Sequence, residues 1–109
     1  MNLQLASPVM RGVYFVNKGI KIFQKLKSGG SVRCVEILAL LKELGFVVRN
    51  GNKGGHKTFY HPKLTELRGH FDCGHSDRYE IKECYKKNIL NIIEESEDLI
   101  SVLNGGDDD

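Results

Sequence analysis

The sequence predicts an α+β domain in which a three-stranded antiparallel sheet packs against two helices. Three observations lead to this fold class. Apolar residues recur at helical spacing on both sides of a central region, that region contains short extended runs separated by glycines, and 109 residues suffice for one core. Three strands joined in sequence can bury one face only under a cover, and the two helices are the available cover.

The pattern of residues 1–30 does not predict a helix or strand with defined boundaries. The stretch "VYFV" is compatible with a short strand, and "GIKIFQKLK" with a short basic amphipathic helix that stops at the flexible "KSGG". We therefore expect an N-terminal extension, partly disordered, before the domain proper.

The first helix of the domain is expected to begin after Ser31, which can cap it, and to end at Gly45. Its apolar positions recur at steps of three and four residues, which is typical of a helix with one buried face. They are Val32, Val35, Leu38, Ala39, Leu41 and Leu44.

Three strands and a long helix follow. "FVVRN" and "HKTFYH" flank the turn "GNKGG" and predict a hairpin, and "RGHFDCG" predicts a third strand. In that strand His70 and Asp72 point to one face, and Phe71 and Cys73 to the other. "KECYKKNILNIIEESEDLISVL" predicts one long amphipathic helix. The domain is thus expected over residues 31–103, before a disordered acidic tail at 104–109.

This order of helix, three strands and helix is that of double-stranded-RNA-binding domains, and the charge distribution agrees with such a partner. The net charge is only +2, yet twelve basic and three acidic residues occur up to Arg68, against four basic and eleven acidic residues after it. Such asymmetry favours a polyanionic partner for the first part of the chain. Fold order alone does not establish a function.

Composition narrows the setting of the protein. No apolar run approaches the roughly 18 residues needed to cross a bilayer, and the N-terminus does not resemble a secretory signal, so we expect no membrane partner. Three cysteines are few and odd in number, which predicts free thiols in a reducing compartment. The expected location is the cytoplasm.

The stretch "KGGHKTFYHP", residues 53–62, is the strongest candidate for chemistry. His56 follows a glycine-rich turn, and an imidazole can both take and give a proton near neutral pH. Lys53 and Lys57 could hold a phosphate, and the amides of Gly54 and Gly55 could approach it closely. The alternative is an ordinary hairpin with a surface histidine.

Other groups could assist His56 or serve separately. His70 or Asp72 could orient or assist it, unless they lie on a merely polar sheet face. Lysines at the start of the last helix would form an anion site with the helix N-terminus; they are Lys82, Lys86 and Lys87. A zinc site remains as an alternative, although the spacing lacks paired knuckles. Its ligands would come from His70, Cys73 and His75, with His61 or Cys84 as the fourth.

The motif and the order of elements resemble the HicA family of small bacterial toxins over about residues 31–103. Those proteins read K-G-[S/T]-H-x-x-[F/Y]-x-H-P at this place. The matching residues here are Lys53, Gly54, His56, Phe59, His61 and Pro62. The chain departs from the pattern at Gly55, where the family has a small hydroxyl residue, and in roughly thirty extra residues before the first helix.

The resemblance implies a double-stranded-RNA-binding-like fold and an endoribonuclease that cleaves mRNA and is neutralised by a cognate HicB antitoxin. The catalytic histidine of the family maps onto His56, and no metal or other cofactor is expected. Lys53, Lys57, His61 and the lysines of the last helix would contact RNA. Two other classes stay open: a non-catalytic double-stranded-RNA-binding module and a zinc-stabilised interaction domain.

Overall fold

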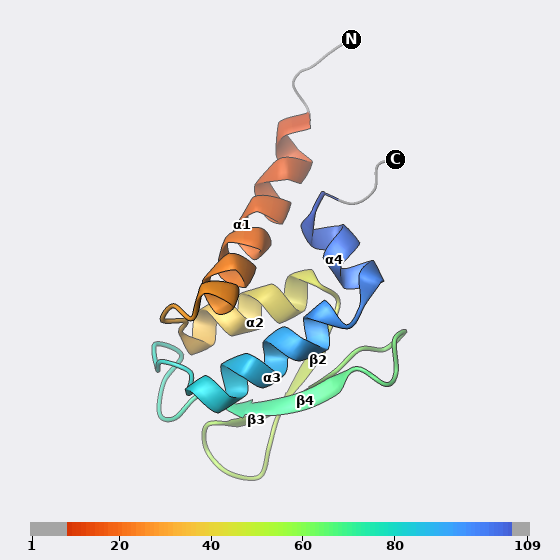
Figure 1. Ribbon diagram of the computed structural model, residues 1–109. Coiled ribbons are helices and arrows are strands. Elements are labelled where there is room, and N and C mark those ends of the chain that lie inside the picture. Colours follow the sequence, from red (N-terminus) through yellow and green to blue (C-terminus); the bar gives the residue numbers. More distant parts are fainter. Residues whose placement is uncertain (1–8, 106–109) are drawn as a thin grey trace.

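The computed structural model describes residues 9–105, with the side chains of its first helix described from residue 18 onward. The chain forms four helices and one antiparallel sheet within that range, in the strand order β2-β3-β4 (Figure 1). The elements are α1 Val9–Ser28, α2 Cys34–Glu43, β2 Val47–Asn50, β3 His56–Tyr60, β4 Arg68–Asp72, α3 Glu83–Glu94 and α4 Glu97–Leu103. The predicted α+β class is confirmed. The disorder expected in the tail falls mainly on residues 106–109, which lie outside the described residues, as do residues 1–8.

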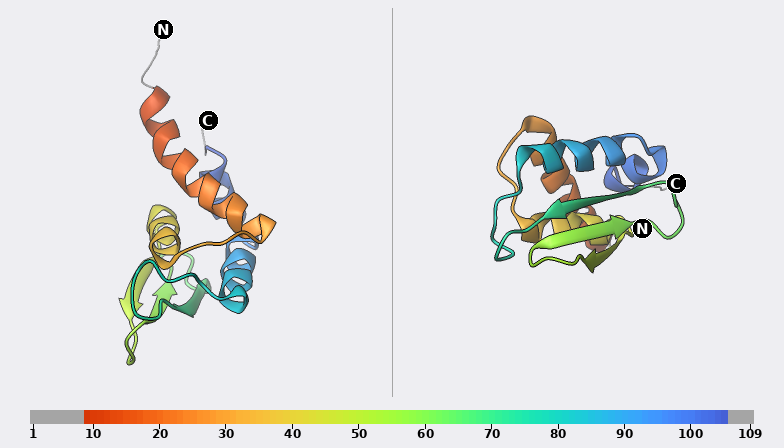
Figure 2. Two further views of the ribbon diagram at one scale, coloured as in Figure 1. Left: turned by 90° about the vertical axis from the view of Figure 1, so that its left-hand side faces the viewer. Right: turned by 90° about the horizontal axis from the view of Figure 1, so that it is seen from below.

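The molecule is layered, with the sheet on one side and the helices on the other. α2 packs against β2 and α3 packs against β4, so both helices cover the same face of the sheet (Figures 1 and 2). α1 lies across α2, α3 and α4 and forms a further layer. The core between sheet and helices is apolar, with Phe59, Phe71, Ile37, Leu40, Ile89 and Ile93 at most 2% exposed. Within residues 9–105 no helix covers the second face of the sheet.

α1 is an integral part of the domain, which corrects the expected N-terminal extension. Ile22, Phe23 and Leu26 recur at helical spacing and are buried in the same core as the residues of α2 and α3. The stretch "VYFV" belongs to this helix and is not a strand. Lys25 Nζ donates a hydrogen bond of 2.6 Å to Glu36 Oε2 and ties α1 to α2.

The start of α2 differs from the sequence prediction, whereas its end agrees with it. α2 begins at Cys34, because the backbone amide of Arg33 donates to Glu36 Oε1 at 2.9 Å and caps the helix there; Ser31 does not. Gly45 ends the helix with a φ of 91°, as predicted.

The predicted long final helix is interrupted between α3 and α4. Ser96 caps α4, since its Oγ accepts a hydrogen bond from the Leu99 amide at 3.3 Å. The break turns α4 so that Leu99 and Leu103 are buried, and α4 packs against α1.

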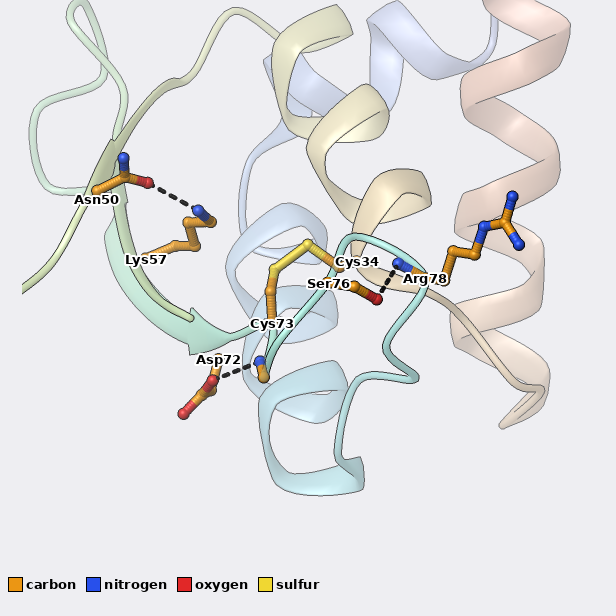
Figure 3. Close-up of a disulfide and its surroundings, with 8 residues drawn as sticks. Cys34, Asn50, Lys57, Asp72, Cys73, Ser76 and Arg78 are labelled. Atoms are coloured by element: carbon orange, nitrogen blue, oxygen red, sulfur yellow. Dashed lines mark hydrogen bonds between the residues drawn. A yellow bond between two sulfur atoms is a disulfide. The ribbon is translucent and has the colours of Figure 1, made fainter. Parts of the chain in front are cut away.

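A disulfide joins Cys34 to Cys73, so the prediction of three free thiols is wrong for two of them. It links the start of α2 to the residue after β4, across 39 positions of sequence, and both residues are at most 3% exposed (Figure 3). Cys84 is exposed and has a free thiol. None of the helices within residues 9–105 has the length and apolarity needed to cross a bilayer.

Candidate functional site

Strand β3 divides its side chains between the core and the uncovered face of the sheet. Phe59 is 2% exposed and points toward the helices, so His56, Thr58 and Tyr60 point to the other side, which we call the open face. Lys57 lies two residues before Phe59 and so points to the same side of the strand as Phe59. Its Nζ donates a hydrogen bond of 2.7 Å to Asn50 Oδ1 (Figure 3). Lys57 therefore does not share a face with His56, which corrects its expected place beside that imidazole.

Strand β4 brings a second histidine to the open face. Phe71 is fully buried, so Arg68 and His70 point away from the core, as the sequence predicted for His70. The rings of His56 and His70 lie 5.3 Å apart between centroids, with 33° between their planes. The two imidazoles thus form a pair across neighbouring strands.

Arginine and tyrosine side chains lie beside the histidine pair on the same face of the sheet. In the sheet register Arg49 of β2 lies opposite Thr58, which lies opposite His70, and Tyr60 lies opposite Arg68. Arg49 Nη2 donates a hydrogen bond of 3.3 Å to the Tyr60 hydroxyl. This bond raises the pKa of Arg49 above its ordinary value, so the guanidinium stays charged at any physiological pH.

Residues of β3 and β4 line a shallow pocket of about 570 Å³ on the open face. The lining consists of His56, Thr58, Phe59, Tyr60, Arg68, Gly69 and His70. Tyr85, from the first turn of α3, places its ring 5.7 Å from the ring of His70 and extends the site toward that helix. An open, aromatic and cationic surface of this kind suits the backbone of a single-stranded nucleic acid.

The turn before β3 fits closely around His56. The Gly51 amide donates to the His56 carbonyl at 2.8 Å, and the His56 amide donates to the Lys53 carbonyl at 2.8 Å. A Cβ on Gly51 would lie 2.5 Å from Cδ2 of His56, so only glycine leaves room for the imidazole. Lys53 and Gly54 are exposed at the tip of the turn, where they can reach a ligand.

Asp72 lies opposite His56 in the sheet register, yet its carboxylate is engaged elsewhere. Asp72 Oδ1 accepts a hydrogen bond of 2.7 Å from the Gly74 amide, which fixes the chain as it leaves β4 (Figure 3). Asp72 holds the chain after β4, and the ring nearest to His56 on this face is that of His70, at 5.3 Å between centroids.

His61 is a structural residue, which corrects its expected contact with RNA. It is 8% exposed, and its Nδ1 accepts hydrogen bonds from the amides of Lys63 and Leu64 at 3.2 and 3.1 Å. The ring proton therefore resides on Nε2, which donates to the Leu44 carbonyl at 3.1 Å. Both nitrogens are used, so this histidine is unavailable to a ligand.

The predicted anion site on α3 loses one of its three lysines. Lys86 is 6% exposed, and its Nζ donates to the Gly30 carbonyl at 2.7 Å and lies 3.2 Å from Glu83 Oε1. It joins α3 to the segment between α1 and α2 and cannot bind RNA in this position. Lys82, the N-cap of α3, and Lys87 remain exposed.

The zinc interpretation loses one of its three central ligands, Cys73, and one of the two candidates for the fourth ligand, His61. The sulfur of Cys73 is bonded to Cys34, and both nitrogens of His61 are taken. Within residues 9–105 no group of three or more histidine, cysteine, aspartate or glutamate side chains is placed to hold a metal ion.

Sequence reasoning missed three residues of the open face and one beside it. Arg49, Tyr60 and Arg68 belong to the open face, and Tyr85 of α3 lies beside His70. A usable signal was present for two strand residues, because Tyr60 alternates in phase with His56 along β3, and Arg68 in phase with His70 along β4.

Comparison of the chain with protein-family models, curated proteins and solved structures finds no match.

Proposed function

We propose that this protein is an endoribonuclease of the toxin type, similar to the HicA family, and that it cleaves RNA on the open face of its sheet. The observation that carries the proposal is the pair of imidazoles, His56 and His70, side by side on a solvent-facing surface that also bears Arg49 and Arg68. Two imidazoles beside cationic groups can transfer protons at a phosphodiester.

The proposed reaction is internal transesterification of RNA. The ribose 2′-oxygen forms a bond to phosphorus while the bond from phosphorus to the 5′-oxygen breaks. One imidazole takes the proton of the 2′-hydroxyl, and the other, as imidazolium, gives a proton to the leaving 5′-oxygen. Arg49 and Arg68 offset the negative charge that builds up on the phosphate. His56 and His70 supply both proton transfers, so the proposed step needs no cofactor.

The wider assignment follows the resemblance. We propose a double-stranded-RNA-binding-like arrangement for α2, the sheet and α3, an mRNA substrate and a HicB-type antitoxin as the neutralising partner. We place the activity in the cytoplasm, where mRNA is found. The disulfide between Cys34 and Cys73 counts against this location, because a reducing compartment favours the thiol form of both residues.

The test is cleavage of purified RNA by the purified protein in the presence of a chelator. His56→Ala and His70→Ala should each lower the cleavage rate by about 100-fold or more. His75→Ala, at an exposed loop histidine, should leave the rate unchanged. RNA binding without cleavage, at any protein concentration, would contradict the enzyme and favour the non-catalytic module. Growth arrest on expression, lost with His56→Ala, tests the toxin assignment.

A further inference from the structure

A second concave surface lies between α1 and α2, away from the histidine pair. This groove measures about 440 Å³. Lysines of α1 form one wall, and aliphatic side chains of both helices form the floor. We call it the basic groove, and its residues are Lys18, Lys21, Ile22, Lys25, Val35, Glu36 and Ala39.

The charges of the basic groove are only partly balanced. Lys25 pairs with Glu36 at 2.6 Å. Lys18 and Lys21 form no salt bridge among the side chains described from residue 18 to 105, although the charge of Lys18 lowers the pKa of Glu43. Val35, on the α2 side, is 47% exposed and adds apolar surface to the groove. A cationic wall over an apolar floor fits an acidic segment that carries an aliphatic side chain. It fits RNA less well, because a phosphate backbone gains nothing from an apolar floor.

The outer face of α4 has the complementary character. Leu99 and Leu103 point inward and are buried, while Glu97, Asp98 and Val102 are exposed. Asp98 and Val102 are four residues apart and so lie on the same side of the helix. No lysine or arginine occurs after Lys87, so nothing in this part of the sequence offsets the acidic charge. We call this surface the acidic helix face.

We propose that the basic groove of one copy receives the acidic helix face of a second copy of this chain. Val35 and Val102 are the exposed large hydrophobic residues of the region the structure describes, and they belong to these two oppositely charged surfaces. The contact buries both and brings Glu97 and Asp98 to Lys18 and Lys21. It forms between chains, because Leu99 and Leu103 hold α4 against its own core with the acidic helix face outward.

The groove and the helix face are different surfaces. Two copies can exchange the contact reciprocally in a two-fold symmetric dimer; otherwise the contact is heterologous, and successive copies form a ring or an open chain. A helix of seven residues fills a small interface, and the association should therefore be weak and should weaken further as salt rises. This inference is independent of RNA cleavage.

The experiment is sedimentation of the full chain over a range of protein and salt concentrations. The wild-type protein should associate at low salt, and Val35→Ser should weaken the association. Two charge reversals test the contact itself: Lys18→Glu with Lys21→Glu, and Glu97→Lys with Asp98→Lys. Each reversed protein alone should sediment as a monomer, because its groove and its helix face then carry charge of the same sign.

A mixture of the two reversed proteins should associate again, because each groove then meets a helix face of opposite charge. The matched control reverses two exposed lysines outside the groove, Lys63→Glu with Lys87→Glu, and should associate like the wild type. Circular dichroism verifies that every variant is folded. A wild-type protein that stays monomeric, or reversed proteins that do not recover association when mixed, would overturn the proposal. If reversal of Lys18 and Lys21 abolished RNA binding and left association unchanged, the groove would be assigned to RNA and the proposal would be overturned.

Discussion

Gly55 lies so close to the backbone of Gly74 that no side chain fits between them. A Cβ on Gly55 would lie 2.1 Å from the Gly74 carbonyl oxygen and 2.4 Å from its amide nitrogen. The Gly55 carbonyl also accepts a hydrogen bond of 2.8 Å from the Cys73 amide. The turn before His56 is therefore fastened to the loop after β4. The glycine that departs from the HicA pattern is a steric requirement of this chain.

Replacing Gly55 by serine, a residue that the HicA pattern has at this position, should destabilise this protein. The added Cβ must push two backbone segments apart, so we expect a loss of about 2–3 kcal/mol in the free energy of unfolding. Gly54→Ser is the matched control, because nothing lies within 4 Å of a Cβ there, and it should change stability by less than about 0.5 kcal/mol. Urea unfolding of both variants measures the difference. Equal stabilities would show that the loop after β4 yields easily.

The disulfide should contribute strongly to stability, because it closes a loop across 39 positions in a small domain. Loss of the cross-link in a Cys34→Ala, Cys73→Ala variant should lower the free energy of unfolding by about 4 kcal/mol on the chain-entropy model. The thermal midpoint should fall by about 15 °C or more.

Alkylation followed by mass measurement verifies the state of each cysteine. The native protein should take up label at Cys84 only, and the reduced, unfolded protein should also take it up at Cys34 and Cys73. Cys84→Ser is the control for the stability measurement and should leave the thermal midpoint unchanged, since Cys84 is exposed. Labelling of all three thiols in the native protein would contradict the cross-link.

Substitution of His61 should lower stability, whereas substitution of His70 should abolish RNA cleavage without lowering stability. His61→Ala leaves the Leu44 carbonyl and two backbone amides without partners, so we expect a loss of about 2–4 kcal/mol in stability. His70→Ala removes an exposed side chain and should keep the stability while losing RNA cleavage. Thermal unfolding and cleavage assays on the same samples give the comparison. If the His61→Ala protein were stable but impaired in cleavage, His61 would contact RNA and would not have a structural role.

The sequence predicted the parts of the fold that depend on local pattern. The hairpin and the third strand follow from alternation and turn glycines, and Gly45 ends α2 as expected. The break before α4 had a local signal, Ser96 followed by two acidic residues, but the continuing helical period concealed it. The place of α1 depends on packing of Ile22, Phe23 and Leu26 against distant helices, which no local pattern reveals.

The residues of the candidate site also fall into two groups: those whose orientation follows from local pattern, and those whose partners are distant in sequence. Alternation along β4 predicts that His70 points away from the core, and alternation along β3 would have separated Lys57 from His56. The pairing of the two histidines follows from the register between the strands. His61 and Lys86 were misjudged because their partners are the carbonyls of Leu44 and Gly30, 17 and 56 positions away. The disulfide partner is likewise distant in sequence. Such contacts depend on the tertiary fold, so local patterns in one sequence do not predict them.

Two glutamates of α2 have pKa values shifted in opposite directions. Burial raises the pKa of Glu36, but its hydrogen bonds from Lys25 and the Arg33 amide outweigh burial and hold the pKa below the usual value. Burial raises the pKa of Glu43 above its usual value, and Lys18 offsets this only in part. Ionised Glu36 therefore favours the folded state, whereas ionised Glu43 opposes it.

Replacing each glutamate by glutamine should shift stability in opposite directions at neutral pH. Glu36→Gln should lower the thermal midpoint, because the depressed pKa of Glu36 contributes stability that is present above the unfolded-state pKa and lost as pH falls. Glu43→Gln should raise the midpoint, because its raised pKa means that stability is lost as pH rises through the folded-state pKa. Well below the ordinary glutamate pKa of about 4.3 both residues are protonated, and both differences should shrink. Thermal unfolding followed by circular dichroism from pH 2 to pH 7 measures them, and shifts of the same sign at pH 7 would contradict the assignment.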